Sequence, residues 1–364
     1  MGGKAERVVA VGFMSGTSLD GVDVAAIETD GDSISWLGPT LTEPYPPPLR
    51  ARLRALLGKR RGQVADLEAT EQTLTEFHAA AFARLTPALE RTGRRAALLG
   101  FHGQTLLHRP EQHLTVQIGD GALLARLTGI ATVCDFRSAD VAAGGQGAPL
   151  VPVFHRALAG QLPKPVMVVN MGGVANVTWI GADDTMVAFD TGPGNAPIDD
   201  WVRDKAGLDH DVGGMLAASG TVDDRILGQL MAAPYLRRAP PKSLDRDDFN
   251  YRGCADLSVQ DGAATLCEFT AQAIAGARTL VPEPPQAWIL CGGGRHNLHL
   301  VARLRALLAP AAVQLSDDVK WDGDALEAQA FAYLAVRSKY GLPLSYPTTT
   351  GVPRPMLGGR MFLP

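Results

Sequence analysis

Glycine, hydroxyl and carboxylate residues gather near the start of the chain, in the stretch GFMSGTSLDGVD between the apolar runs RVVAV and VAAIE. Backbone N–H groups of Gly16, Thr17 and Ser18 could form a nest around a phosphate. Asp20 or Asp23 would repel that phosphate unless a cation such as Mg²⁺ stood between them. A plain hairpin turn, in which Asp and Ser bond to their own backbone, explains the same residues equally well.

The established phosphate-binding motifs are absent. The sequence has no G-x-x-x-x-G-K-[ST], and this turn lies between two strands, whereas a P-loop leads from a strand into a helix. The segments CGGGRHN and AAGGQGAPL carry Asn297 and Leu150 where a dinucleotide-binding fingerprint requires its third glycine. A second glycine turn between strands, NMGGVAN, favours phosphate binding, because two such loops facing each other can grip a triphosphate. The glycines of CGGG, after a buried strand, would let a nucleotide approach the backbone.

Three further segments carry residues able to do chemistry. Asp190, at the end of a buried strand in FDTGPGN, is well placed for general-base catalysis. The alternative is a cap for a helix at residues 199–206. His102 and Gln104 follow another strand end in GFHGQT, where a lone histidine is more often structural. Arg137, in DFRSADVAAGGQGAPLVP, suits an anion clamp on a substrate loop, or else a surface arginine.

The order of apolar runs, helical stripes and glycine turns is repeated along the chain. In the first half the pattern predicts three strands, then helix, strand, helix and strand, at residues 7–13, 22–29, 33–38, 67–89, 96–103, 120–129 and 130–136. In the second half it predicts the same order at residues 165–173, 174–181, 185–195, 263–280, 287–294, 297–308 and 312–316, and then a helix at 324–337. Three antiparallel strands followed by strand–helix alternation give a mixed sheet.

This repeat predicts a two-domain α/β protein. The length of 364 residues suits two domains, which we place at residues 1–138 and 139–364, with the C-terminal helix packing back on the first. Ligands commonly bind in the cleft between two such domains, so we expect the glycine loops and Asp190 to face it.

The composition is that of an ordinary soluble protein, with 46% hydrophobic residues and a net charge of −4. Neither sign of charge dominates, which argues against nucleic acid and anionic membranes as partners. The four cysteines show no CxxC spacing, which favours buried, reduced thiols. No apolar run reaches the ~18–20 residues that span a bilayer, and the first residues lack a signal sequence. We therefore expect a cytoplasmic protein.

The motifs quoted above, together with TVQIGDGALLA and DALEAQAFAYLA, occur in the order typical of one family. On these motifs, from residue 12 to residue 335, the chain resembles the anhydro-N-acetylmuramic acid kinases of the sugar kinase, actin and chaperone ATPase superfamily. The resemblance implies two actin-like ATPase (ribonuclease H-like) domains with mixed five-stranded sheets. It also implies use of ATP and Mg²⁺, a homodimer, and a role in peptidoglycan recycling. The reaction would open 1,6-anhydro-N-acetylmuramic acid with water and phosphorylate its 6-oxygen, giving N-acetylmuramic acid 6-phosphate and ADP.

The resemblance also assigns roles to individual residues. Asp190 would be the base that activates water, and Asp20 would hold Mg²⁺, directly or through water. The sugar would be held by His102, Gln104, Arg137 and Glu327. The nucleotide would be bound by Gly16, Thr17, Ser18, Leu19, Asp20, Gly21, Val22, Asp23, Gly172, Gly173, Gly292, Gly293 and Gly294.

Two segments depart from the family pattern. PKSLDRDDFN stands where members carry a stretch nearer PKSTGRExF, which leaves Lys242 and Ser243 without an assigned role. Ser138 and Ala139 occupy positions where some members carry arginine, so a second contact to the lactyl carboxylate would have to come from elsewhere. Two alternative functions remain open: a sugar kinase that phosphorylates a hydroxyl without adding water, and an actin-like or chaperone-like ATP switch.

Overall fold

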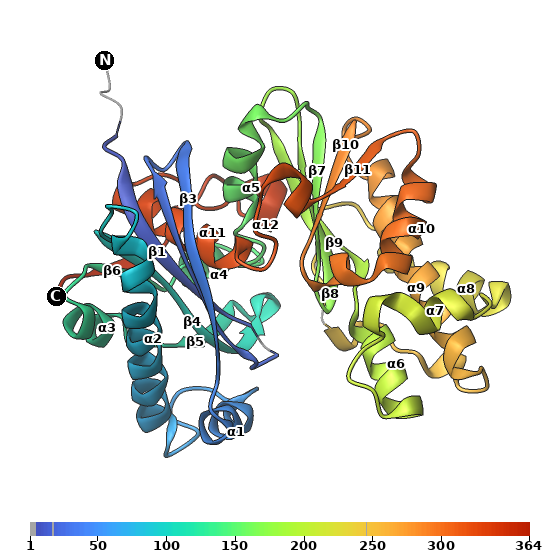
Figure 1. Ribbon diagram of the computed structural model, residues 1–364, viewed down its shortest axis with the longest axis horizontal. Coiled ribbons are helices and arrows are strands. Elements are labelled where there is room, and N and C mark those ends of the chain that lie inside the picture. The colour runs from blue at the N-terminus through green and yellow to red at the C-terminus, as the bar shows by residue number, and fades with distance from the viewer. Residues whose placement is uncertain (1–4, 17, 245) are drawn as a thin grey trace. The chain divides into compact units, whose positions relative to one another are not determined.

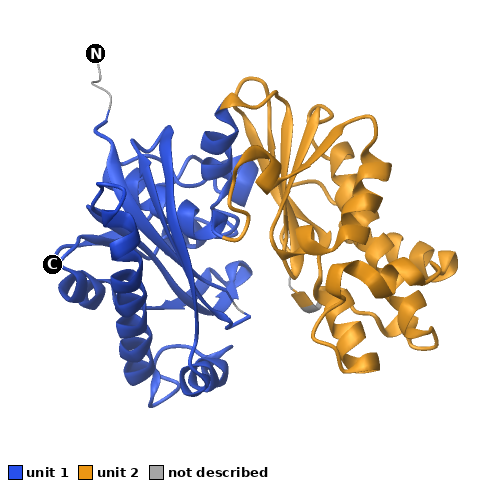
Figure 2. Ribbon diagram, viewed as in Figure 1, with its two compact units in different colours: residues 1–160, 325–364 blue, residues 161–324 orange. Residues whose placement is uncertain are grey.

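The computed structural model describes residues 5–16, 18–244 and 246–364, which form two compact units (Figure 2). Unit 1 contains the chain up to Gly160 and again from Ala325, and unit 2 contains Gln161–Asp324. The expected boundary after Ser138 is therefore wrong. The segment beyond it stays in unit 1 because the buried ring of Phe154 packs on Tyr333, with centroids 5.7 Å apart.

Unit 1 is built on a mixed sheet in the order β12-β6-β4-β1-β2-β3, with β5 paired to β4. The strands β1, β2 and β3 are antiparallel neighbours, and β4 and β6 run parallel to β1. The five expected strands are present, and β5 and β12 extend the sheet. The bounds are β1 (Val8–Ser15), β2 (Gly21–Thr29), β3 (Ile34–Pro44), β4 (Leu98–Arg109), β5 (Leu114–Ile118), β6 (Thr132–Cys134) and β12 (Arg360–Phe362).

Helices cover both faces of this sheet (Figure 1). In β1 the alternate residues Val11 and Phe13 pack against α2 (Leu67–Glu90) and α3 (Gly121–Thr128). The opposite face receives α11 (Leu326–Lys339). It comes so close that a Cβ at Gly12 would overlap the backbone of Ala328, and one at Gly100 the backbone of Phe331. The remaining helices of unit 1 are α1 (Pro47–Leu56), α4 (Ser138–Ala142), α5 (Pro152–Leu158) and α12 (Pro347–Thr350).

Unit 2 repeats the core of this topology in a five-stranded sheet, ordered β11-β10-β7-β8-β9. The strands β7, β8 and β9 are antiparallel neighbours, and β10 and β11 run parallel to β7. The bounds are β7 (Val166–Met171), β8 (Val174–Ile180), β9 (Met186–Pro193), β10 (Ala287–Cys291) and β11 (Ala312–Leu315).

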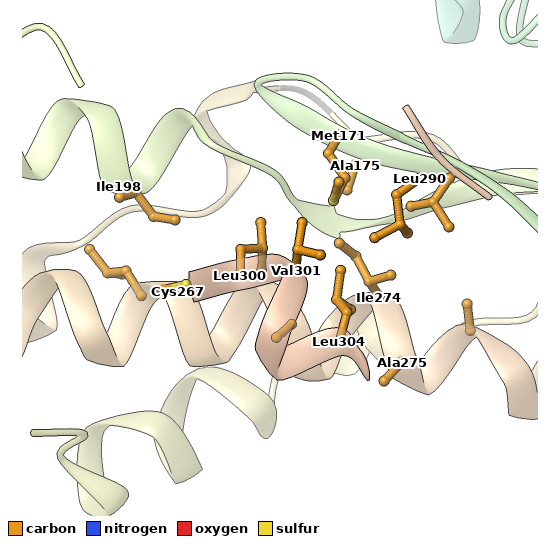
Figure 3. Packing of buried hydrophobic residues seen from close by; sticks show 14 of the residues in the cluster. Met171, Ala175, Ile198, Cys267, Ile274, Ala275, Leu290, Leu300, Val301 and Leu304 are labelled. Atoms are coloured by element: carbon orange, nitrogen blue, oxygen red, sulfur yellow. The ribbon is translucent and has the colours of Figure 1, made fainter. Parts of the chain in front are cut away.

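A buried apolar cluster joins this sheet to its helices. The main helices are α6 (Ala196–Ala206), α9 (Val259–Gly276) and α10 (Leu298–Leu308), with the shorter α7 (Met215–Ser219) and α8 (Asp224–Met231). Figure 3 shows part of the cluster, in which Ile274, Leu300 and Leu304 pack with Met171, Ala175 and Leu290. The cysteines Cys254 and Cys267 belong to this core as free thiols, as expected. Across the described ranges, no helix has the length and apolarity needed to cross a membrane.

Candidate active site

The first candidate loop is a tight turn between β1 and β2 in unit 1. The N–H of Leu19 donates to the carbonyl of Gly16 at 3.2 Å, and Leu19 has a left-handed φ of 59°. Ser18 and Asp20 are exposed, and a Cβ at Gly16 would meet nothing closer than 3.5 Å. Thr17 lies outside the described residues. The backbone of Gly16 and Ser18 is therefore accessible, as a phosphate nest requires.

Further along the motif, the residues are structural. Leu19 is 1% exposed in the core below the turn, and Val22 is buried between the sheet and α2. Position 21 must be a glycine because it packs closely against β3, where an added Cβ would overlap the backbone of Glu43. Asp23 accepts a 2.6 Å hydrogen bond from Thr42. Of the predicted nucleotide-binding stretch, the part that offers open backbone and an exposed carboxylate ends at Asp20.

Buried polar groups hold this turn from below. Ser15 Oγ accepts from the hydroxyl of Tyr45 at 2.7 Å and lies 3.1 Å from Nε2 of His78. Nδ1 of His78 donates to the carbonyl of Leu74 at 2.7 Å, and burial lowers its pKa to about 4, so the ring is neutral. These three residues could not be predicted from the sequence, because their types and spacing carry no motif.

Gln104 also contacts the turn. Its side chain is completely buried, and Nε2 donates to the carbonyl of Gly16 at 3.1 Å. Oε1 has no hydrogen-bond partner among the described residues, so one acceptor is left for a ligand. The amide thus supports the phosphate turn, a contact that the sequence did not predict.

Arg137 and His102 form a hydrogen-bonded pair in the same unit. Nη1 of Arg137 donates to the carbonyl of Gly147 at 2.7 Å, which fixes the glycine-rich segment after α4. His102 is 5% exposed, and its Nδ1 donates to the carbonyl of Gly103 at 2.8 Å. Burial, reinforced by the charge of Arg137, lowers the pKa of His102 well below 6.5. The arginine is half-buried and hydrogen-bonded to both His102 and Gly147, which argues against a freely solvated surface arginine.

Glu327 lies in the first turn of α11 and is coupled to Arg137. Surrounding protein raises the pKa of its carboxyl and Asp23 adds to this, while the charge of Arg137 opposes it. The Glu327 side chain nevertheless remains exposed to solvent. Three of the four predicted sugar-binding residues, Arg137, His102 and Glu327, therefore belong to one electrostatic cluster of unit 1.

Asp190 lies within β9 of unit 2 beside a β-bulge. Ala175 pairs with Gly192 and Asn176 with Asp190, so Thr191 is the extra residue. A strand that ends at Asp190 was expected, but β9 continues to Pro193. The cap alternative is wrong, because α6 starts after Asn195. Bulges redirect side chains next to active sites, which suits a catalytic carboxylate at this position.

The segment after η4 (Pro234–Arg237) holds the Asp190 carboxylate. The N–H of Leu244 donates to Oδ2 at 2.8 Å, and the N–H of Asp190 donates to the carbonyl of Lys242 at 3.0 Å. Burial raises the pKa of Asp190 to about 7, against the lowering effects of the Leu244 bond and the Lys242 charge. A carboxyl with a pKa close to neutrality is suited to accept and release a proton.

The glycine turns of unit 2 converge at the ends of β7 and β10. The carbonyls of Gly172 and Gly173 accept from the backbone of residues 194–196. Gly292 and Gly294 are required by packing, because added Cβ atoms would overlap Asn170 and Met171. A Cβ at Gly293 would meet nothing within 4 Å, and its φ is not left-handed. The backbone at Gly293 is therefore open enough for a ligand to approach it closely.

A metal site is not preformed in the described part of the chain, where no group of three or more His, Cys, Asp or Glu is arranged to hold an ion. Asp20 is paired with Arg50, with Nη2 3.0 Å from Oδ1, and its side chain is 73% exposed. A hard cation bridged to phosphate needs few protein ligands, and one exposed carboxylate beside an open backbone turn fits that requirement.

The strand order defines the class of protein. In both units the sheet core reads third, second, first, fourth, fifth, with the first three strands antiparallel. Two such sheets in one chain, each with a glycine turn between its first two strands, are the arrangement of the actin-like ATPase (ribonuclease H-like) domains.

Comparison with known proteins gives the family. The model of the anhydro-N-acetylmuramic acid kinase family matches residues 8–364. Anhydro-N-acetylmuramic acid kinase of Rhodospirillum rubrum is 55% identical over 97% of this chain and 93% of its own length. That of Acidiphilium cryptum is 53% identical over 98% of both chains, and that of Rhodopseudomonas palustris is 50% identical over 98% and 100%. The chain belongs to the anhydro-N-acetylmuramic acid kinase family, a family of enzymes.

Proposed function

We propose that this enzyme converts 1,6-anhydro-N-acetylmuramic acid, ATP and water into N-acetylmuramic acid 6-phosphate and ADP, as a step in peptidoglycan recycling. Family membership supports the substrate and the phosphoryl transfer. One observation in the structure carries the proposal furthest. Asp190 is a bulge-directed carboxylate that is anchored through Oδ2 and has a pKa of about 7.

This geometry supports Asp190 as the base in the following proposed reaction. Asp190 takes a proton from a water molecule, whose oxygen forms a bond to the anomeric carbon while the bond from that carbon to O6 breaks. A positioned base of this kind contributes typically ~10²–10⁴-fold. O6 gains the electron pair and attacks the γ-phosphorus of ATP, and ADP leaves with the bridging oxygen. The proton held by Asp190 then returns to solvent.

Binding of ATP is supported by accessible backbone in each unit. The turn at Gly16 and Ser18, the Gly172–Gly173 turn and Gly293 have little or no packing around the missing side chain. Mg²⁺, when bound, supplies charge stabilisation for the transferred phosphoryl group. Asp20 is the residue that would meet it.

Sugar binding is assigned to the cluster of unit 1. Arg137 is a half-buried cation that suits the lactyl carboxylate of the sugar. The neutral His102 presents Nε2 toward Arg137 and thereby holds the guanidinium plane. Glu327 offers a carboxylate to sugar hydroxyls, and Gln104 offers its Oε1. A cytoplasmic homodimer, implied by the family resemblance, completes the proposal, and sedimentation velocity tests the dimer.

The deciding experiment combines product mass with one variant. We expect a product heavier than the anhydro sugar by one phosphoryl group and one water. Asp190→Asn should still bind ATP but lose turnover by at least ~10²-fold. Asp199→Asn is the matched control, because its pKa is also raised by burial, to about 6, but it lies on α6. A product without added water would indicate a plain sugar kinase, and sugar-independent ATP hydrolysis would indicate a switch.

A further inference from the structure

Hydrogen bonds link Lys242, Tyr235 and Asp190 to one another in unit 2. Nζ of Lys242 donates to the carbonyl of Tyr235 at 2.9 Å and lies 3.3 Å from that of Leu236. The hydroxyl of Tyr235 donates to the carbonyl of Asp190 at 2.9 Å, and the N–H of Asp190 donates back to the carbonyl of Lys242 at 3.0 Å. Each of the three residues is therefore hydrogen-bonded to both of the others.

The Lys242 ammonium is unusually placed for a lysine. The residue is 3% exposed, and Nζ lies 4.5 Å from the ring centroid of Tyr235 and 5.6 Å from that of Phe189. Lysine is almost never buried without a partner, because its charge loses hydration. Two carbonyls and two aromatic faces compensate part of that loss. The nearby ionised group that benefits from the charge is Asp190.

We infer that Lys242 is a positioning residue for the proposed base: its buried ammonium keeps the Asp190 carboxylate ionised and oriented for the attack of water. The inference rests on the proposed function of Asp190. Leu244, from the same segment, fixes Oδ2 of the carboxylate.

Among the described residues, Arg238 and Asp248 are charged groups that act on Lys242 or Tyr235. Arg238 acts on Lys242 and on Tyr235, and Asp248 acts on Tyr235. Burial, with Arg238, lowers the pKa of Lys242 to about 8, and Asp190 opposes this change. Asp190 loses its proton near pH 7 and Lys242 near pH 8, so both are charged together mainly between these values.

The test compares the pH dependence of kcat/KM in Lys242→Met, Lys242→Arg and the wild type. Removal of the charge should move the acid limb of the profile upward by roughly one pH unit, whereas arginine should leave it near its original place. At pH 9 the wild-type lysine is largely neutral, so the rates of Lys242→Met and the wild type should converge. A merely structural lysine would lower the rate at every pH.

Lys205→Met is the matched control. Lys205 also donates to a carbonyl, that of Ala255 at 2.8 Å, and lies 4.9 Å from the ring centroid of Trp201, but it is not coupled to Asp190. The acid limb of the pH profile of kcat/KM should not move in Lys205→Met. If Lys242→Met does not fold, Lys242→Gln keeps a donor for the carbonyls and gives the same comparison.

A direct titration separates this inference from the proposed function. The carboxyl of Asp190 is followed by ¹³C NMR in the full chain, with Asp190→Asn used to assign the signal. An upward shift of its midpoint in Lys242→Met is expected. An unchanged midpoint overturns the inference, whatever the rates show. A shifted midpoint with an unchanged pH–rate profile leaves the Lys242 effect standing and overturns the role of Asp190 as base.

Discussion

Two nitrogens of Arg137, Nε and Nη2, each lie 3.1 Å from a single acceptor, Nε2 of His102. A protonated histidine could not accept these bonds, and its charge would stand beside a half-buried guanidinium. The pair therefore requires a neutral ring with its proton on Nδ1, which agrees with the lowered pKa of His102. This relationship orients Arg137 without neutralising its charge.

Arg137→Lys should lower kcat/KM for the anhydro sugar by about 10- to 100-fold, because a lysine ammonium cannot reproduce the planar fork. Steady-state kinetics at saturating ATP measure the effect. Arg156→Lys is the control, since Arg156 lies over the ring of Tyr346 at 5.8 Å. Equal kcat/KM in Arg137→Lys and wild type would remove Arg137 from the sugar site.

The glycines after β10 should respond in opposite ways to alanine. Gly292→Ala should lower the free energy of unfolding by about 3 kcal/mol, because the residue has φ 74° and a Cβ would overlap Asn170. Gly293→Ala should melt like the wild type but bind ATP at least ~10-fold more weakly. Thermal melting and calorimetric titration with ATP distinguish the two. Normal ATP binding by Gly293→Ala would contradict the proposed contact.

Asp140 should be important for stability although it lies outside the proposed contacts. Its carboxylate is 2% exposed and accepts from Gly147 N at 2.6 Å, from Thr350 Oγ1 at 2.6 Å and from Ser345 Oγ. Asp140→Asn turns an N–H₂ group toward these donors and should cost about 2–4 kcal/mol. Chemical denaturation measures the loss. Asp183→Asn, on an exposed turn, should change little, and an equal effect there would contradict the argument.

Asp190→Asn should stabilise unit 2 in a pH-dependent manner. The folded pKa of Asp190, about 7, is above the ordinary 3.8, so the folded state binds its proton more tightly than the unfolded chain. The wild type is therefore penalised progressively as the pH rises from about 3.8 to about 7, and the penalty is complete above that value. The variant should gain about 2–4 kcal/mol at pH 8 and almost nothing at pH 4. Denaturation at the two pH values measures this, and an equal gain at both would contradict the raised pKa.

The elements could be predicted because their patterns are local. Alternation of apolar residues in β1, the helical stripe of α2 and the glycine turns between strands all depend on neighbours within a few positions. The two added strands of unit 1 were missed for the converse reason. Strand β12 is only three residues long and is held by pairing with β6, far away in the sequence. Strand β5 is half-exposed, and its polar residues interrupt the apolar pattern that would have predicted a strand.

The sequence by itself determined the repeated strand order, the family, and the identity of the residues that bear chemistry, including Asp190. Tertiary structure alone decided how those residues are tuned. The bulge at Thr191, the Leu244 bond to Asp190 and the Ser15–Tyr45–His78 contacts join segments 14 to 63 positions apart in the chain. Burial and hydrogen bonding across such distances set a pKa, because desolvation depends on what packs around a group and not on its neighbours in sequence.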